Sequence, residues 1–246
     1  MFYTIIFVYS LGCALGSQVP SIRQNGKIVG GQSTSIQQHP YQVALLYEND
    51  YHNCGGSLIS EKWVLTAAHC ISSIKYFVRV GSTLETEGGV VHKAKNQYAH
   101  EKFNYTTVDY DYGLIELETP VQLSDSVKIV KLPEAGFELD AGTLLNVTGW
   151  GSRRSSTLQL VTVPFVEDDV CKESHPDRLI SNQMFCAGSM AGGHGPCNGD
   201  SGGPVVSNGV QYGIVSWSYG CAQPFYPAVY AKVSAARDWI KNISGI

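Results

Sequence analysis

The chain has 246 residues, of which 43% are hydrophobic and 15% charged, and its 17 basic and 21 acidic side chains give a net charge of −4. This composition is typical of a globular protein with one large or two small all-β units. Residues 1–27 hold two of the basic side chains and no acidic one, so the remainder has 15 against 21 and a charge of −6. Such an acidic balance excludes nucleic acid as an expected partner, because a phosphate backbone attracts basic surfaces.

The first 16 residues are apolar and uncharged, and they end on the small residues Ala14 and Gly16. They are too short to span a membrane, and they predict a secretory signal peptide, with a buried N-terminal strand as the alternative. Residues 17–27 are polar and contain Pro20 and Gly26, which predicts an exposed propeptide that ends at Lys27. We therefore expect a secreted, extracellular, soluble protein with no membrane partner.

Beyond Lys27, apolar runs of four to eight residues alternate with turn residues, which is the pattern of strands. The runs are 42–47, 57–60, 63–67, 77–80 and 112–117 in the first half, and 145–150, 158–163, 184–187, 204–206, 210–217 and 228–233 in the second. They predict an all-β protein of two barrels with a junction near 124–133. One helix is predicted, from Ser234 as its N-cap to about Ile243, with Trp239, Ile240 and Ile243 on one side.

Seven cysteines are present, and Cys13 falls in the predicted signal peptide. The other six suit disulfides made in an oxidising compartment, but six cysteines allow fifteen pairings, so their partners stay open at this point. Zinc is the competing explanation. No Cys-x-x-Cys or His-Glu-x-x-His spacing occurs, so we expect no metal site and no cofactor.

The stretch 195–204 reads Gly-Pro-Cys-Asn-Gly-Asp-Ser-Gly-Gly-Pro. Its four glycines and two prolines exclude a helix or a regular strand and predict a shaped loop. Ser201 lies at its centre with glycines close by, so the backbone N–H groups can approach a bound group. This pattern suits a nucleophile with an oxyanion hole, although a glycine-rich surface turn is the alternative.

A nucleophilic serine needs a base, and no histidine follows Ser201. The α/β-hydrolase order, in which the histidine comes after the serine, is therefore excluded. Among the upstream histidines, His69 stands out because small residues precede it and Cys70 follows it. We predict that His69 is the base, with a packed core histidine as the alternative.

Four short motifs then fall into a known order: Ile28-Val29-Gly30-Gly31, Thr66-Ala67-Ala68-His69-Cys70, Asp111-Tyr112-Gly113-Leu114-Ile115 and Gly199-Asp200-Ser201-Gly202-Gly203-Pro204. From Ile28 to its C-terminus the chain resembles the chymotrypsin (trypsin-like) family of serine proteases, and in appearance the arthropod digestive members most. The resemblance implies two six-stranded antiparallel β-barrels with a C-terminal helix over 28–246. It also implies a secreted serine endopeptidase that acts on proteins or peptides through an acyl-enzyme.

The same resemblance implies the roles of individual residues. It pairs Cys54 with Cys70, Cys171 with Cys186 and Cys197 with Cys221, makes Asp111 the third member of a triad with His69 and Ser201, and gives the oxyanion hole to the N–H groups of Gly199 and Ser201. Asp109 competes with Asp111, but an acid that enters an apolar strand suits burial better, and we expect Asp109 to be solvated. Ser216 resembles the serine that supports the buried acid, and residues 216–218 are expected to pair with the substrate backbone.

The family's three specificity positions correspond to Gly195, Ser218 and Ala228, none of which is charged. A trypsin-like pocket needs a buried carboxylate to hold Lys or Arg, since an unpaired buried cation costs several kcal/mol. We therefore expect basic P1 residues, the residues on the acyl side of the cleaved bond, to be rejected. A medium-sized apolar P1 residue such as Leu, Met or Phe is expected instead.

The resemblance also predicts activation by cleavage between Lys27 and Ile28. The new amino group of Ile28 would pair with Asp200 and shape the oxyanion hole, with turn capping as the alternative role of Asp200. A pocket that rejects lysine cannot cut after Lys27, so we expect a zymogen and a separate trypsin-like activating protease. Protein inhibitors and a monomeric state are further expectations.

A catalytically inactive homologue that binds a partner without cleaving it is the alternative function. Its usual sign is a lost triad residue, and none is lost here. Ser218 and Pro196 are the residues that would obstruct such a site without touching the triad.

Overall fold

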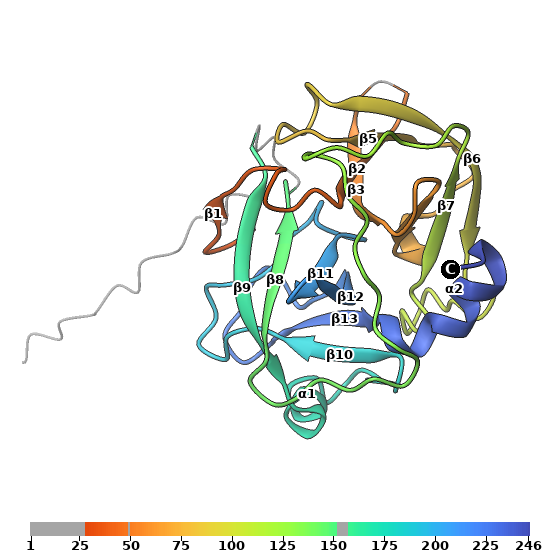
Figure 1. Ribbon diagram of the computed structural model, residues 1–246. Coiled ribbons are helices and arrows are strands. Elements are labelled where there is room, and N and C mark those ends of the chain that lie inside the picture. Colours follow the sequence, from red (N-terminus) through yellow and green to blue (C-terminus); the bar gives the residue numbers. More distant parts are fainter. Residues whose placement is uncertain (1–27, 49, 152–156) are drawn as a thin grey trace, which may run out of the picture.

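The computed structural model describes residues 28–48, 50–151 and 157–246 (Figure 1). The predicted signal peptide, propeptide and Lys27 fall on residues 1–27 and lie outside the described residues. None of the described helices is long and apolar enough to cross a membrane.

Six strands of the first half close into a barrel in the order β2-β3-β4-β7-β6-β5, with antiparallel neighbours throughout. These strands are β2 (Gln42–Leu46), β3 (His52–Leu58), β4 (Trp63–Thr66), β5 (Phe77–Val80), β6 (Val90–Ala99) and β7 (Gly113–Leu117). Alternate side chains point inward and fill the barrel with residues such as Val43, Leu65 and Leu114, which have no exposed surface.

The second half forms a sheet in the order β1-β9-β10-β13-β12-β11-β8, which closes because β8 also pairs with β9. Its strands are β8 (Leu144–Gly149), β9 (Gln159–Val166), β10 (Met184–Ala187), β11 (Pro204–Ser207), β12 (Val210–Trp217) and β13 (Ala228–Lys232), with the short β1 (Gln32–Ser33) added at β9. The prediction of two six-stranded antiparallel barrels is confirmed. The connection between them runs over 118–143 and includes the predicted junction at 124–133.

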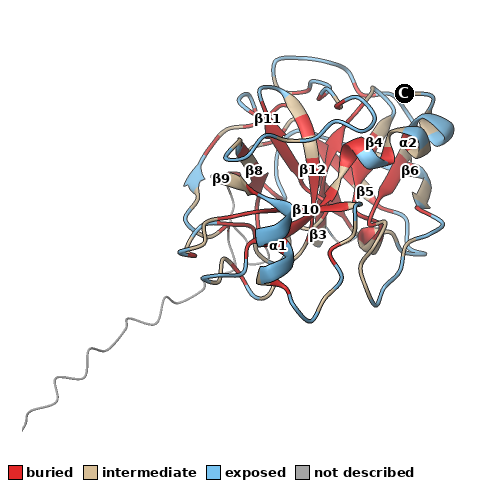
Figure 2. Cartoon of the chain, turned by 90° about the horizontal axis from the view of Figure 1, so that it is seen from below, coloured by how far each residue is buried: buried red, intermediate tan, exposed pale blue. Residues whose placement is uncertain are grey.

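Two strands of the first barrel differ from the prediction. β6 was not predicted, because only Ala94 in it is buried and its Val90 and Val91 are exposed, so it lacks an apolar run. The run predicted at 57–60 is the end of β3, which begins at His52. The first part of this strand was not predicted because it contains Gly55 and Gly56, and glycine is unfavourable in a strand unless another backbone approaches closely. Figure 2 shows buried strands surrounded by exposed connections.

The helices also differ from the prediction. A 3₁₀ turn at Val233–Ala236 precedes α2 (Arg237–Ser244), so Ser234 is not the N-cap, and its hydroxyl donates to the Phe137 carbonyl oxygen at 2.8 Å. Ile240 is fully buried, but Ile243 is exposed and does not share its side. The short α1 (Asp168–Ser174) was not predicted, because Cys171 is its only buried residue. In Figure 1, α2 lies beside β6 and β7, and Ile240 joins the core of the first barrel.

Three disulfides link the pairs that the resemblance implies, Cys54–Cys70, Cys171–Cys186 and Cys197–Cys221. Each closes a loop of 15 to 24 residues, and such a loop is worth about 3 kcal/mol in the chain-entropy model. All six sulfur atoms are bonded to one another in pairs, so none of them offers the thiolate that a zinc site requires.

Candidate active site

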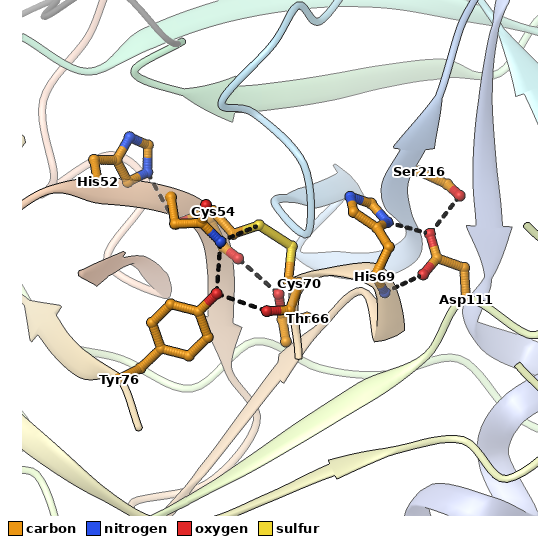
Figure 3. The surroundings of a disulfide bond; sticks show 10 residues. His52, Cys54, Thr66, His69, Cys70, Tyr76, Asp111 and Ser216 are labelled. Atoms are coloured by element: carbon orange, nitrogen blue, oxygen red, sulfur yellow. Dashed lines mark hydrogen bonds and ion pairs between the residues drawn. A yellow bond between two sulfur atoms is a disulfide. The ribbon is translucent and has the colours of Figure 1, made fainter. Parts of the chain in front are cut away.

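A buried carboxylate lies where the two barrels meet. Asp111 lies two residues before the start of β7 and is 1% exposed. One carboxylate oxygen accepts the His69 backbone N–H at 2.9 Å, and the other accepts His69 Nδ1–H at 2.7 Å and the Ser216 hydroxyl at 2.6 Å (Figure 3). Because Nδ1 carries the proton toward Asp111, the other ring nitrogen of His69 has a free lone pair that can accept a proton.

Asp109 behaves differently from our expectation. It is half-buried rather than solvated, and its carboxylate accepts hydrogen bonds from the Ser181 hydroxyl and from the N–H of Tyr110. Asp109 therefore holds together the loop before Asp111, whereas Asp111 contacts the histidine. A polar neighbour 72 positions away, such as Ser181, leaves no signal in the local sequence.

His69 lies in a 3₁₀ turn, Ala68–Cys70, that the Cys54–Cys70 disulfide and the Tyr76 hydroxyl fix in place, the latter by donating to the Cys70 carbonyl oxygen at 2.6 Å. Close packing in front of this turn suits the glycine at position 113. A Cβ atom there would lie 2.7 Å from the Ala67 carbonyl oxygen. The glycine thus allows a close approach of β7 to the histidine turn.

The loop around Ser201 is fixed by backbone contacts to both barrels. The Ser201 carbonyl oxygen accepts the Gly55 N–H at 2.8 Å, and the N–H of Gly202 donates to the Val215 carbonyl oxygen at 2.8 Å. Gly202 has φ +77°, and a Cβ atom on it would overlap the Thr66 hydroxyl. Only glycine fits this position without strain, as the loop composition indicated.

Two backbone N–H groups beside the serine are unpaired. Those of Gly199 and Ser201 donate to no acceptor in the described part of the chain. Nor does a hydrogen bond join the Ser201 hydroxyl to His69 within the same residues. Catalytic hydrogen bonds are commonly long in unliganded enzymes and shorten when the substrate binds.

A pocket of about 250 Å³ opens beside Ser201. Its walls are uncharged: Pro196, Cys197, Asn198, Ser201, Val215, Ser216, Trp217, Ser218 and Gly220. Of the three predicted pocket residues, Ser218 lines this space, while Gly195 and Ala228 are buried and do not. The structure therefore brings Ser218 and Pro196 to the pocket, and no side chain in its walls can neutralise a cation.

A second buried carboxylate, Asp200, lies next to the serine and is 1% exposed. It accepts the N–H groups of Gly151 at 2.9 Å and Cys197 at 3.0 Å. Burial raises the pKa of Asp200 to about 6, although these two hydrogen bonds and the nearby His52 oppose the rise. Within the described residues no cation forms an ion pair with it.

Sequence reasoning missed the buried ion pair beside Asp200. His52 Nδ1 lies 2.9 Å from a Glu85 carboxylate oxygen, and His52 Nε2 lies 2.9 Å from the Cys54 carbonyl oxygen. Both ring nitrogens therefore lie within hydrogen-bond distance of an oxygen atom. Neither residue belongs to a motif, and their separation along the chain gave no signal.

The segment that follows Lys27 packs against the serine loop. Ile28 is 4% exposed and belongs to the core of the second barrel. The N–H of Val29 donates to Gly195 at 2.9 Å, and the N–H of Gly195 donates back to Val29 at 3.1 Å. Val29, the neighbour of the predicted activation residue Ile28, is thus hydrogen-bonded to the loop that carries Asp200 and Ser201.

Comparison with known proteins agrees with this geometry. The trypsin family model matches residues 28–240. The chain is 41% identical to trypsin 5G1 of Aedes aegypti, over 98% of this chain and 96% of that protein, and 43% identical to a trypsin of Phaedon cochleariae, over 94% and 95%. A vitellin-degrading protease of Bombyx mori is 39% identical over 89% of this chain and 87% of its own length.

The raised pKa of Asp200 makes a prediction for the uncleaved chain. Its folded pKa of about 6 exceeds the ordinary 3.8, so the folded state holds this proton more tightly than the unfolded state. Stability should therefore fall as the pH rises from 4 to 7, by about 3 kcal/mol from this group. Urea unfolding at several pH values, compared with Asp200→Asn, measures it. Parallel pH profiles for the two chains would contradict the prediction.

Proposed function

Since this chain belongs to the trypsin family of serine endopeptidases, we propose that it is a secreted zymogen whose activated form cleaves after uncharged, medium-sized apolar residues. As a member of that family it hydrolyses peptide bonds in protein substrates. Secretion, activation and the P1 preference are the parts that we propose. The observation that carries the P1 preference is the uncharged wall of the pocket beside Ser201.

The proposed mechanism assigns each step to a residue. Ser201 attacks the peptide carbonyl carbon while His69 takes its proton, and the N–H groups of Gly199 and Ser201 stabilise the oxyanion that forms. His69 then protonates the leaving amine, and water hydrolyses the acyl-enzyme with His69 again as base. Asp111 keeps the required tautomer and stabilises the imidazolium, which its 2.7 Å contact with Nδ1 supports.

The P1 proposal differs from what the word trypsin in the relatives' names suggests. A basic P1 side chain would enter a pocket whose wall offers it hydroxyls, an amide, backbone oxygens and apolar carbon, but no carboxylate. Desolvating that cation without a counter-charge costs several kcal/mol. Val215, Trp217 and Pro196 instead offer apolar surface, while Ser218 is larger than a glycine and leaves less room for the largest side chains.

Activation is proposed to act through Asp200. Cleavage after Lys27 would create an ammonium group on Ile28, and the Val29–Gly195 hydrogen bonds hold this segment against the serine loop. A buried, raised-pKa carboxylate gains most from a new cation, because pairing removes the cost of its burial. Lysine at the cleaved bond does not suit the uncharged pocket, so the proposal requires a separate trypsin-like activating protease. The six paired cysteines support an oxidising, extracellular location.

Covalent labelling of Ser201 by an organophosphate tests the enzyme and its activation together. The uncleaved chain should label slowly, and after cleavage at Lys27-Ile28 by added trypsin the rate should rise by about 10² or more, because the oxyanion hole then forms. Ser201→Ala is the matched control and should not label in either state.

Two outcomes would contradict these proposals. A folded, cleaved protein that fails to label would favour the inactive binding homologue. A chain that matures at Lys27-Ile28 without added protease, at a rate that grows with its own concentration and is lost in Ser201→Ala, would exclude both the two-enzyme scheme and the pocket assignment.

A panel of peptides that differ only at P1 tests the pocket. Leu, Met and Phe should give the highest kcat/KM, with Trp lower, and Lys and Arg at least about 100-fold lower because their charge would be buried unpaired. Installing a carboxylate in the pocket wall with Ser218→Asp should raise the relative rate for Lys and Arg. Preferred cleavage after Lys or Arg by the unaltered enzyme would refute the P1 proposal.

A further inference from the structure

A cation lies beside the pocket that the mechanism above does not use. The guanidinium carbon of Arg178 is 4.1 Å from the ring centre of Trp217, and Trp217 is one of the residues that line the pocket beside Ser201. Arg178 is half-buried, and it belongs to the loop between α1 and β10. Stacking on the indole holds its planar group in place.

The charge of Arg178 is not neutralised in the described part of the chain. No carboxylate lies within ion-pair distance of it, and its single hydrogen bond, from Nη2 to the Thr106 carbonyl oxygen, is 3.5 Å long. Asp177, the neighbour of Arg178 in the chain, and Asp109 have other hydrogen-bond partners. Asp177 accepts the Tyr219 hydroxyl at 2.9 Å, and Asp109 accepts the Ser181 hydroxyl. The guanidinium thus keeps free donors.

The path of an extended substrate brings it to this cation. The end of β12 and residues 216–218 border the pocket, and within the described residues the backbone of Ser218 makes no hydrogen bond. A peptide that adds to this edge as a strand places P1 in the pocket and advances about 3.3 Å per residue past Trp217. Residues P3 and P4 therefore lie about 7 to 10 Å upstream of P1.

We propose that Arg178 selects an acidic residue at P3 or P4 of the substrate, where its guanidinium pairs with the carboxylate. Two parallel N–H donors match a carboxylate geometrically, and no other charge in the pocket wall competes for it. This inference rests on the proposed proteolysis. It makes Arg178 a charged determinant of substrate specificity in an enzyme whose P1 pocket contains no charged side chain.

Matched peptides test the inference independently of the P1 proposal. They carry whichever P1 residue the panel above shows to be cleaved best, and Glu, Gln or Lys at P2, P3 or P4 in turn. Glu in place of Gln at P3 or P4 should raise kcat/KM about tenfold, mainly through a lower KM, because the pair forms equally in the bound substrate and the transition state. Lys at the same position should lower it.

Three variants separate the role of Arg178 from general effects. Arg178→Gln should reduce the ratio of kcat/KM for the Glu and Gln peptides to about one, and Arg178→Lys should restore the ratio in part. Lys172→Gln, which removes an exposed cation from α1, is the charge-matched control and should keep the preference. Raising the salt concentration from 0.05 to 0.5 M should weaken the preference.

The readout distinguishes this inference from the proposed function. If the Gln peptides are not cleaved at all, the enzyme proposal fails. If they are cleaved but Glu at P3 and P4 gives no advantage, or if the advantage survives in Arg178→Gln or appears at P2 alone, the role of Arg178 is wrong and the enzyme proposal stands.

Discussion

The buried carboxylate of Asp111 is the group on which the arrangement of the site depends. A charge removed from water costs several kcal/mol unless donors surround it, and here the donors come from both barrels. His69 contributes two from the first barrel, and Ser216 contributes one from β12 of the second. The hydrogen bonds to this one carboxylate therefore link the two barrels. The same contacts fix the orientation of the imidazole ring.

Asp200 presents the opposite situation, since its burial is only partly compensated. Burial raises its pKa to about 6, and two backbone N–H groups and the neighbouring His52 offset only part of that rise. The protein can fold with this carboxylate buried and without a cation beside it. Such a group suits an activation switch, because a later cleavage can supply the positive charge that pairs with it. We propose that Asp111 keeps the same contacts before and after activation, whereas Asp200 gains an ion pair when the chain is cleaved.

The sequence allowed the barrels and the candidate triad to be predicted because both leave local signals. Buried strands are apolar runs, and the serine loop is rich in glycine since its backbone approaches Thr66 closely. β6 left no such signal, because only Ala94 in it is buried. Contacts between distant residues were also invisible, including His52 with Glu85, Arg178 with Trp217, and Asp109 with Ser181. The N-cap at Ser234 failed because its hydroxyl bonds to a loop 97 residues away.

The kcat of Asp111→Asn on the best neutral peptide is the most direct test of the account. An amide of the same shape would still fill the site between His69 and Ser216, but it would present an N–H group where the imidazole needs an acceptor. The account predicts that kcat falls by about 10⁴ near neutral pH with little change in KM, because the wrong tautomer of His69 cannot take the serine proton. A kcat within tenfold of the unaltered enzyme would contradict it.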